Sequence, residues 1–244
     1  MEQKARLFAG WDAPMLRACL QGHMGRVEAE GEDSALASIG DFCFLGGRPV
    51  PPLVERADAP ILVPCGEGWA EQIGAVLGTG AVPFTRYATR HEPECFDKDK
   101  LVSFTRAVPQ GFHIHPIGRD IYFTLMEQEW SRDLCGCFRD ASDFAARGLG
   151  FVVKQGGLTV AGAASYAVCD GAIEIEIDTR PDFRRQGLAA ACGARLILEC
   201  LARNLSPGWD AHDSRSLSLA EKLGYRLERP YRAYWVEKKL RHKT

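Results

Sequence analysis

The chain has 244 residues, of which 46% are hydrophobic and 25% charged, a balance typical of a folded globular protein and not of a disordered or fibrous one. Its formal net charge of -2 argues against the basic surface by which nucleic-acid-binding proteins are recognised. Its apolar stretches are shorter than the roughly 20 residues that a membrane-spanning helix requires. We therefore expect neither nucleic acid nor membrane among its partners.

The N-terminal residues and the cysteines both indicate a cytoplasmic protein. The first eight residues lack the apolar region of a secretory signal. The nine cysteines are odd in number and scattered, which predicts reduced thiols that act as small apolar side chains. Cys135 and Cys137 are separated by one residue and no second pair follows, so we expect no metal site.

The first half of the chain, residues 1–110, is predicted to form a mixed α/β domain without a catalytic signature. Arg86, Arg90 and His91 could bind an anion, but we interpret them as solvated charges near a strand end. The charged, proline-broken segment 91–100 marks the boundary region. The predicted elements are a helix over 13–23, strands over 42–45 and 61–63 with a proline-rich turn over 49–52 between them, a helix over 69–77 and a strand over 82–89.

The second half, residues 111–244, alternates strands and helices more clearly. A Gly-Gly pair at 156–157 predicts a tight hairpin, because glycine adopts positive φ without strain. His113 and His115 share one strand face, and we interpret them as a solvated pair and not as metal ligands. The predicted elements are strands over 112–115, 151–154, 158–168, 172–179, 210–212 and 231–236, and helices over 121–130 extending towards Leu134, over 187–201 and over 214–222.

The stretch from Ile173 to Ala189 carries the strongest chemical signal, because a strand runs into a turn that opens a helix. The first turn of a helix presents unpaired backbone N–H groups and the positive end of the helix dipole, which together suit a diphosphate. Gly187 lets an anion approach the backbone, and Arg184 and Arg185 add positive charge. The turn is therefore predicted to bind a diphosphate.

The pattern Arg184-x-x-Gly187-x-Ala189 resembles the acyl-CoA-binding segment of the GNAT superfamily of N-acetyltransferases. The flanking segments 179–183 and 219–225 also fall where that family has similar residues. The resemblance covers 111–244 and implies an α/β fold of the mixed α+β kind: a twisted, splayed mixed sheet flanked by helices, preceded by the smaller N-terminal domain. That first domain is then either a degenerate copy of the same sheet or the source of the acceptor pocket.

The resemblance also implies how acetyl-CoA, the acyl donor, would be bound. Main-chain groups of Ile177 and Thr179 would pair with the pantetheine arm, as an added strand would. Asp213 stands where the family commonly has Asn, and it could instead only cap the helix that follows. The remaining cofactor-binding positions surround the diphosphate: Arg184, Arg185, Gln186, Gly187, Leu188 and Ala189.

Acyl transfer requires a base, because only a neutral amine has the lone pair that attacks a thioester carbonyl. Glu174 and Glu176 share one face of the predicted strand, and either could be this base or part of a solvated face. Ala220 stands where many family members have the tyrosine that protonates the thiolate. Tyr225 is our candidate for that role, with Tyr166, Ser216 or a water molecule as alternatives.

The sequence favours an N-acetyltransferase that moves an acetyl group from acetyl-CoA to a primary amine of a small molecule or peptide. A non-catalytic acyl-CoA-binding or sensor protein is the alternative, favoured by Ala220. A nucleotide-binding protein fits less well, because the lysine of a P-loop is absent. We expect a monomer or a homodimer.

Overall fold

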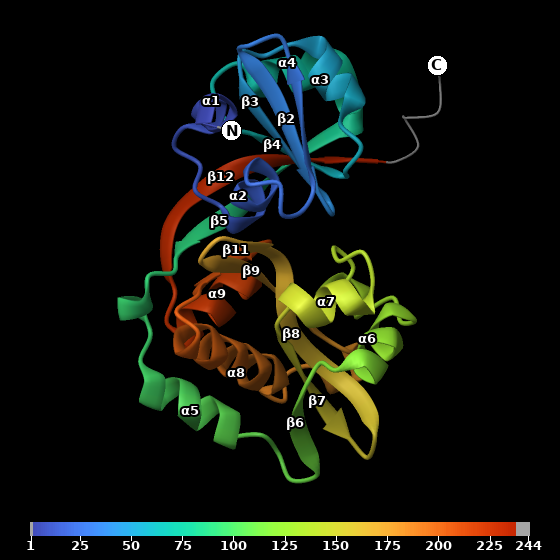
Figure 1. Cartoon of the computed structure of the whole chain (residues 1–244), viewed down its shortest axis with the longest axis vertical. Helices are drawn as coiled ribbons and strands as arrows, with labels where there is room; N and C mark the ends of the chain where they lie inside the picture. The colour runs from blue at the N-terminus through green and yellow to red at the C-terminus, as the bar shows by residue number, and fades with distance from the viewer. Residues whose placement is uncertain (1, 238–244) are drawn as a thin grey trace. The chain divides into compact units, whose positions relative to one another are not determined.

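The computed structural model describes residues 2–237, which form two compact units (Figure 1). Unit 1 comprises residues up to Arg86 together with those from Pro230 onward, and unit 2 is Tyr87–Arg229. Two strands, β5 (Ala81–Arg90) and β12 (Arg226–Val236), run from one unit into the other. The boundary between the two compact units thus falls after Arg86, and the part of β12 from Pro230 onward belongs to unit 1. The division into an N-terminal domain of residues 1–110 and an acyltransferase domain of residues 111–244 stays a prediction.

Unit 1 is built on a mixed sheet in the order β1-β2-β3-β4-β12-β5. The first three strands pair antiparallel, β3 and β4 pair parallel, and β12 lies antiparallel to β4. The indole of Trp69, fully buried, donates to the carbonyl of Gly47 at 3.0 Å and anchors α4 on the sheet. The elements that lie wholly in this unit are α1 (Glu2–Ala5), η1 (Arg6–Phe8), α2 (Pro14–Leu20), β1 (Arg26–Glu30), β2 (Ser34–Ile39), β3 (Phe42–Gly47), α3 (Pro51–Arg56), β4 (Ile61–Pro64), α4 (Trp69–Leu77) and η2 (Gly78–Gly80).

Two sequence-based expectations for unit 1 are wrong. The proline-rich segment is not only a turn, because Pro51 begins α3, where the ring's fixed φ and missing N–H suit the first helical position. Arg86 is not solvated: it is 6% exposed, and its guanidinium lies 4.8 Å from the centre of the Phe42 ring. A cation over an aromatic face can be buried at lower cost than an isolated charge.

Unit 2 contains a five-stranded sheet in the order β10-β9-β8-β7-β6. Its pairs are antiparallel except β10 and β9, which run parallel. The predicted hairpin joins β7 to β8, with Gly156 and Gly157 at positive φ. The elements of this unit are η3 (Pro93–Cys95), α5 (Lys98–Arg106), β6 (Phe112–Pro116), α6 (Arg119–Met126), η4 (Arg132–Leu134), α7 (Ala141–Arg147), β7 (Gly150–Gln155), β8 (Leu158–Cys169), β9 (Ala172–Thr179), η5 (Pro181–Phe183), α8 (Leu188–Ala202), β10 (Ser206–Gly208), β11 (Asp210–Ala211) and α9 (Ser214–Leu223).

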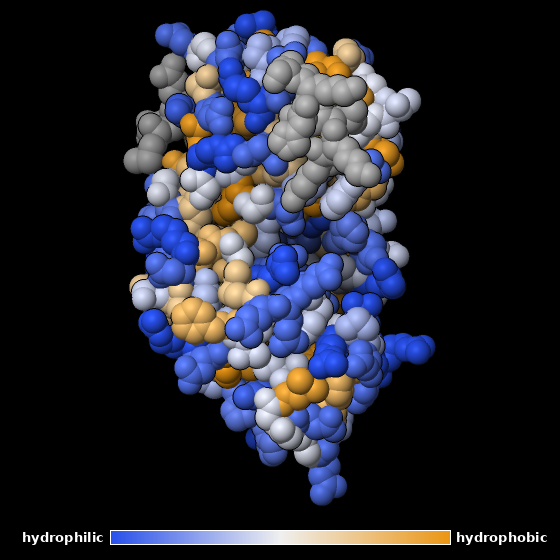
Figure 2. All heavy atoms as spheres, turned by 90° about the vertical axis from the view of Figure 1, so that its right-hand side faces the viewer, coloured by the Kyte–Doolittle hydropathy of each residue, from blue (hydrophilic) through white to orange (hydrophobic). Residues whose placement is uncertain are grey.

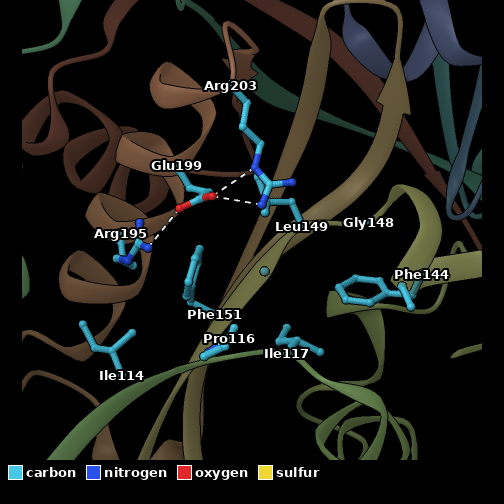
Figure 3. A pocket seen from close by; sticks show the side chains of 12 residues that line it. Ile114, Pro116, Ile117, Phe144, Gly148, Leu149, Phe151, Arg195, Glu199 and Arg203 are labelled. Carbon is cyan, nitrogen blue, oxygen red and sulfur yellow. Dashed lines mark hydrogen bonds and ion pairs between the residues drawn. The ribbon is translucent and has the colours of Figure 1, made fainter. Parts of the chain in front are cut away.

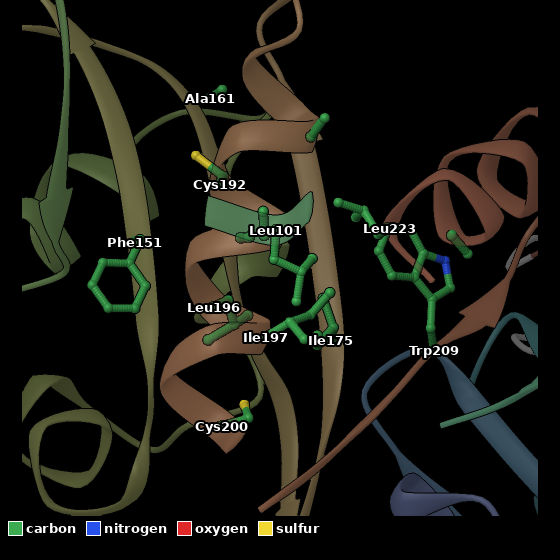
Figure 4. Close-up of a cluster of buried hydrophobic side chains, with 14 of the residues drawn as sticks. Leu101, Phe151, Ala161, Ile175, Cys192, Leu196, Ile197, Cys200, Trp209 and Leu223 are labelled. Carbon is green, nitrogen blue, oxygen red and sulfur yellow. The ribbon is translucent and has the colours of Figure 1, made fainter. Parts of the chain in front are cut away.

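Helix α8 lies on one side of this sheet beside α5, and its apolar side chains form the core of the unit (Figure 1). Figure 4 shows Leu196 and Ile197 of α8 beside Ile175 of β9. Gly193 permits a close approach, because an added Cβ would lie 2.9 Å from side-chain atoms of both Ile177 and Leu223. This packing fixes the N-terminal end of α8 relative to the end of β9.

Helix α6 ends earlier than the sequence pattern predicts. It stops at Met126, and the chain turns before η4. The hydroxyl of Ser131, which is fully buried, donates to the carbonyl of Leu125 at 2.8 Å. The Ser131 hydroxyl thus satisfies a carbonyl at the end of α6 that would otherwise accept a backbone N–H of a further helical turn. The apolar residues beyond Met126 therefore lie in a turn and not in a helix.

The face drawn in Figure 2 is mostly hydrophilic, with apolar side chains in small scattered groups. Within residues 2–237, no helix combines the length and the apolar character that crossing a bilayer requires. The large apolar side chains that the structure leaves exposed are Val82, Phe123, Leu158, Leu227 and Trp235.

Candidate functional site

The sheet of unit 2 opens along the edge of β9. Strand β10 pairs with β9 only as far as Gly208, which lies opposite Glu174. The chain then leaves the sheet, and β11 pairs with the Tyr87 and Ala88 end of β5 instead. Among the described residues no strand pairs with β9 on that side from Ile175 to Thr179. The sheet is therefore splayed at the strand that precedes the predicted diphosphate turn.

Glu174 lies where the two strands part. It is 4% exposed, and its Oε1 accepts the backbone N–H of Asp210 at 2.7 Å. The carbonyl of Trp209 accepts the hydroxyl of Thr89 at 2.7 Å. A backbone N–H that is removed from water needs an acceptor. Because the pairing of β10 with β9 ends at Gly208, the Asp210 N–H donates to the Glu174 carboxylate instead of to the main chain of β9. Glu174 thus has a structural role that its position in the sequence did not reveal.

Hydrogen bonds at the two ends of β9 show which main-chain groups face the opening. The carbonyl of Gly171 accepts from Ser206 at 2.8 Å on the β10 side, and the N–H of Arg180 donates to Val160 at 2.9 Å on the β8 side. Because these directions alternate along a strand, the odd-numbered residues direct their N–H and C=O groups into the opening. Ile177 is one of them.

Thr179 also faces the opening, but its main-chain groups are already engaged. Its N–H donates to Oδ1 of Asp178 at 2.6 Å, and its carbonyl accepts Nε of Arg184 at 3.1 Å. Its side-chain Oγ1 is buried and has no hydrogen-bond partner within residues 2–237. Of Thr179, only this hydroxyl is left unsatisfied.

The turn after β9 places an exposed helix N-terminus beside this opening. Gly187 is the N-cap of α8 with φ 81°, and no side chain caps the helix. Arg185 also has positive φ, 62°, which is uncommon for a residue with a Cβ. A Cβ added to Gly187 would meet no atom within 4 Å. The first amides of this 15-residue helix are thus open to an anion.

The charged side chains around the turn interact in part with one another. Nη2 of Arg184 lies 3.9 Å from Oδ1 of Asp178. Burial raises the pKa of the Asp178 carboxyl, and Asp133 raises it further, while the Thr179 amide and Arg184 lower it. Asp133 is a neighbour that the sequence gave no reason to expect, since it lies 45 positions away in η4. Arg185 and Gln186 are exposed on the same turn.

Glu176 lies on the same strand face as Glu174 but in different surroundings. It is half-buried and lies opposite Ala164 of β8. The register of β8 against β9 shifts between Ser165 and Ala167, so Tyr166 is the extra residue of a β-bulge. Glu176 therefore lies on the part of β9 that β10 does not pair with, whereas Glu174 lies where that pairing ends.

Tyr225 is enclosed in the core. It is 2% exposed, and its ring lies 5.0 Å from that of Phe96 and 5.3 Å from that of Trp209. Burial raises the pKa of its phenol well above the usual value, and its hydroxyl has no hydrogen-bond partner within residues 2–237. Ala220 is fully buried, and Ser216 accepts a hydrogen bond from the Trp209 indole at 3.1 Å. Tyr225 and Ala220 thus present no accessible polar group, whereas the half-buried hydroxyl of Ser216 can still donate a hydrogen bond.

Asp213 caps α9. Its Oδ1 accepts the N–H groups of Arg215 and Ser216, both at 2.9 Å. These hydrogen bonds and the Arg215 guanidinium lower the pKa of its carboxyl, with the Ser216 amide contributing most. Its predicted role in cofactor binding is untested, and the capping alternative is what the geometry displays.

No group of three or more His, Cys, Asp or Glu in residues 2–237 is placed to hold a metal ion. The rings of His113 and His115 lie 6.5 Å apart on β6. All nine cysteines, each within the described range, are free thiols. Burial raises the pKa of Cys135, Cys192 and Cys200 to about 12, so these thiols stay protonated near neutral pH.

Comparison with known proteins agrees with this geometry. The family model for GNAT acetyltransferases matches residues 5–234. A curated relative, the uncharacterized N-acetyltransferase YdfB of Bacillus subtilis (strain 168), is 26% identical over 171 residues, which cover 68% of this chain; the match spans 62% of that relative's length.

Two solved structures are similar over nearly the whole chain. A GCN5-related N-acetyltransferase-like protein from Streptococcus suis 89/1591 is 43% identical, with a TM-score of 0.93 and coverage of 97% of this chain and 98% of that one. A GCN5-related N-acetyltransferase from Kribbella flavida is 18% identical, with a TM-score of 0.59 and coverage of 93% and 96%. The second likeness concerns the fold alone.

Proposed function

Because the chain belongs to the GNAT acetyltransferase family, we propose that it transfers an acetyl group from acetyl-CoA to a primary amine of a small molecule or peptide. One observation carries the proposal: the uncapped N-terminus of α8 follows the end of β9 whose edge β10 leaves open. An anion site and a strand edge suit the diphosphate and the pantetheine arm of one ligand.

The residues present fit coenzyme A. Backbone N–H groups from Arg185 to Ala189 would hold the diphosphate, and the space beside Gly187 admits it without a clash. The main chain of Ile177 would pair with the pantetheine arm. The buried hydroxyl of Thr179 is an orphaned polar atom at the same end of β9, where a ligand can satisfy it. Acetyl-CoA would supply the activated acyl group.

Glu176 is our candidate for the base. The attacking amine must lose a proton, and a carboxylate in the splayed part of β9 can accept it directly or through a water molecule. Glu174 is less suited, because its Oε1 already accepts the Asp210 amide. The amine nitrogen then bonds to the carbonyl carbon, the carbon–sulfur bond breaks, and the thiolate takes up a proton. The enclosed hydroxyl of Tyr225 does not suit that last step, which leaves Tyr166, Ser216 or a water molecule as the donor.

A non-catalytic acyl-CoA-binding protein is the second candidate function. The observation that favours it is the environment of α9: Ala220 is fully buried and offers no acid, and Asp213 is used as a cap. A protein with the same anion site but no acid would bind acetyl-CoA and release it unchanged.

A thiol-release assay separates the two candidates. Acetyl-CoA is incubated with the protein and a panel of primary amines, and free coenzyme A is followed alongside calorimetric binding. We expect turnover on at least one amine, with Glu176→Gln reducing the rate by about 100-fold, in the range usual for loss of a general base. Affinity for coenzyme A should be unchanged in this variant. Tight binding without turnover on any amine would support the second candidate.

A further inference from the structure

A cavity of about 520 Å³ lies on unit 2 outside the diphosphate turn. Its apolar walls come from β6, from the ends of α7 and β7, and from the segment that joins α7 to β7, as Figure 3 shows with Ile114, Phe144 and Phe151. Its volume falls in the range of about 300 to 1,000 Å³ usual for small-molecule sites. The residues that line it are Ile114, Pro116, Ile117, Phe144, Ala145, Gly148, Leu149, Gly150, Phe151, Arg195, Glu199 and Arg203.

Three charged side chains at four-residue spacing, Arg195 and Glu199 of α8 and its C-cap residue Arg203, form the polar rim of this cavity (Figure 3). Glu199 Oε2 lies 2.9 Å from Nη2 of Arg195, and its Oε1 lies 3.0 and 2.9 Å from Nε and Nη2 of Arg203. The two arginines, Arg203 first, lower the pKa of Glu199, which therefore stays ionised. Two guanidinium groups and one carboxylate leave one positive charge in excess.

Contacts within the protein hold both arginine side chains in place and leave some of their N–H groups without a partner on Glu199. The guanidinium of Arg195 lies 4.3 Å from the centre of the Phe151 ring, which fixes it over the apolar wall. Arg203 uses only one edge of its guanidinium for Glu199, so its other N–H groups remain on the far edge. A guanidinium edge matches a carboxylate in two parallel hydrogen bonds. The rim can thus accept one more anion.

We propose that this cavity binds an apolar monocarboxylate, with the hydrocarbon body against Ile114, Pro116 and Ile117 and the carboxylate on Arg203. These three side chains are at least partly exposed and suit an apolar body, and the excess positive charge selects an anion. The ligand is independent of the acyl donor, since no residue of the cavity belongs to the turn 184–189. The site is a second ligand site whatever reaction the protein catalyses.

Calorimetric or NMR titration of the full chain with hexanoate tests the proposal, with hexanol as the uncharged probe of the same tail. We expect saturable hexanoate binding and about 10-fold weaker binding of hexanol, the loss usual for a charge-assisted hydrogen-bonded pair. Arg203→Gln should weaken hexanoate by a similar factor and leave hexanol unchanged. Arg106→Gln, which removes an exposed charge that does not line the cavity, should change neither.

Two neighbouring alanines of α7 supply a steric control. Ala145 lines the cavity and Ala146 does not, and both are exposed, so neither substitution should prevent folding. Ala145→Trp should abolish hexanoate binding, and Ala146→Trp should leave it intact. Equal binding of hexanol and hexanoate, undiminished binding to Ala145→Trp, or no saturable binding to the unmodified protein would each overturn the proposal.

Discussion

The two anion sites that we propose near the ends of α8 are of different kinds. At its N-terminus the donors are backbone amides around Gly187, and the sequence within six residues determines them. Towards its C-terminal end the donors are the side chains of Arg195, in the middle of α8, and of the C-cap residue Arg203. They form a site only together with residues of β6, α7 and β7. The comparison teaches that a backbone site can be found in a short motif, whereas a side-chain site depends on the tertiary fold.

The substitution with the largest expected effect acts on the backbone site alone. Gly187→Asp places a carboxylate at the proposed diphosphate position, and we expect coenzyme A affinity to fall at least about 100-fold, or about 3 kcal/mol. Gly187→Asn is the matched control, because Asn has nearly the same size and tolerates positive φ. The Gly187→Asn variant should lose much less of its affinity for coenzyme A. Equal losses in calorimetry would mean that backbone strain, not charge, causes the effect. Hexanoate binding should survive in both.

A second substitution acts on the wall of the cavity. Asp143 of α7, whose side chain is 3% exposed, receives hydrogen bonds from Arg147 at 2.8 and 2.9 Å and from Arg139 at 3.2 Å. These hydrogen bonds, those of Arg147 foremost, hold the pKa of Asp143 well below its usual value. Asp143→Asn should lower the free energy of unfolding near neutral pH by about 2 kcal/mol.

The pH dependence of that loss has a definite sign. A carboxyl with a lowered folded-state pKa stabilises the fold above its unfolded pKa, about 3.9, and this stabilisation is lost as the pH falls towards the folded value. Denaturation of Asp143→Asn and of the unmodified protein should therefore converge below about pH 4. A difference that stays constant as the pH falls well below about 4 would assign the effect to packing and not to charge.

A third substitution separates helix capping from cofactor binding. Asp213→Ala removes the cap of α9 and should cost about 1 kcal/mol of stability in thermal or denaturant unfolding. Asp213→Asn keeps a capping oxygen and should cost less. Coenzyme A affinity should be the same in both variants if Asp213 acts only as a cap. A loss of affinity in Asp213→Ala that Asp213→Asn does not show would support the cofactor-binding role that the resemblance implies.

The smallest expected effect concerns Arg185, which has positive φ. Arg185→Gly removes its charge and eases the backbone strain, and we expect stability to change by less than about 1 kcal/mol and coenzyme A affinity to fall about 3-fold. Arg185→Ala loses the same charge but keeps the strain, so it should be the less stable of the two in denaturant unfolding. The reverse order would show that the positive φ of residue 185 costs less than the extra freedom of glycine in the unfolded chain.

The sequence predicted those elements whose signal is local. The helix at Trp69–Leu77 and the strand at Ala172–Thr179 were predicted to the residue, because periodicity and flanking breakers define them. The GNAT fold followed from a motif of six residues. β1, β2, α7 and β10 were not predicted, since their residues lack clear periodicity and are specified by packing within their own units. α5 was missed although it is amphipathic, because it begins inside the charged segment 91–100 that was interpreted as a boundary.

The candidate site was predictable to the same extent. The open turn around Gly187 lies where the motif placed it, but the different surroundings of Glu174 and Glu176 could not be seen. They arise because the chain leaves β9 after Gly208, a tertiary event that leaves one carboxylate bonded to the Asp210 amide. The enclosure of Tyr225 between Phe96 and Trp209 is equally non-local.

The central claim is that amides at the N-terminus of α8 bind coenzyme A. Titration of isotope-labelled protein with coenzyme A, followed through backbone amide shifts, tests it most directly. The account predicts that the largest saturable shifts fall on the amides of Arg185 to Ala189, and that those of Arg195 to Arg203 move little. Saturable binding that leaves the amides around Gly187 unshifted would contradict it.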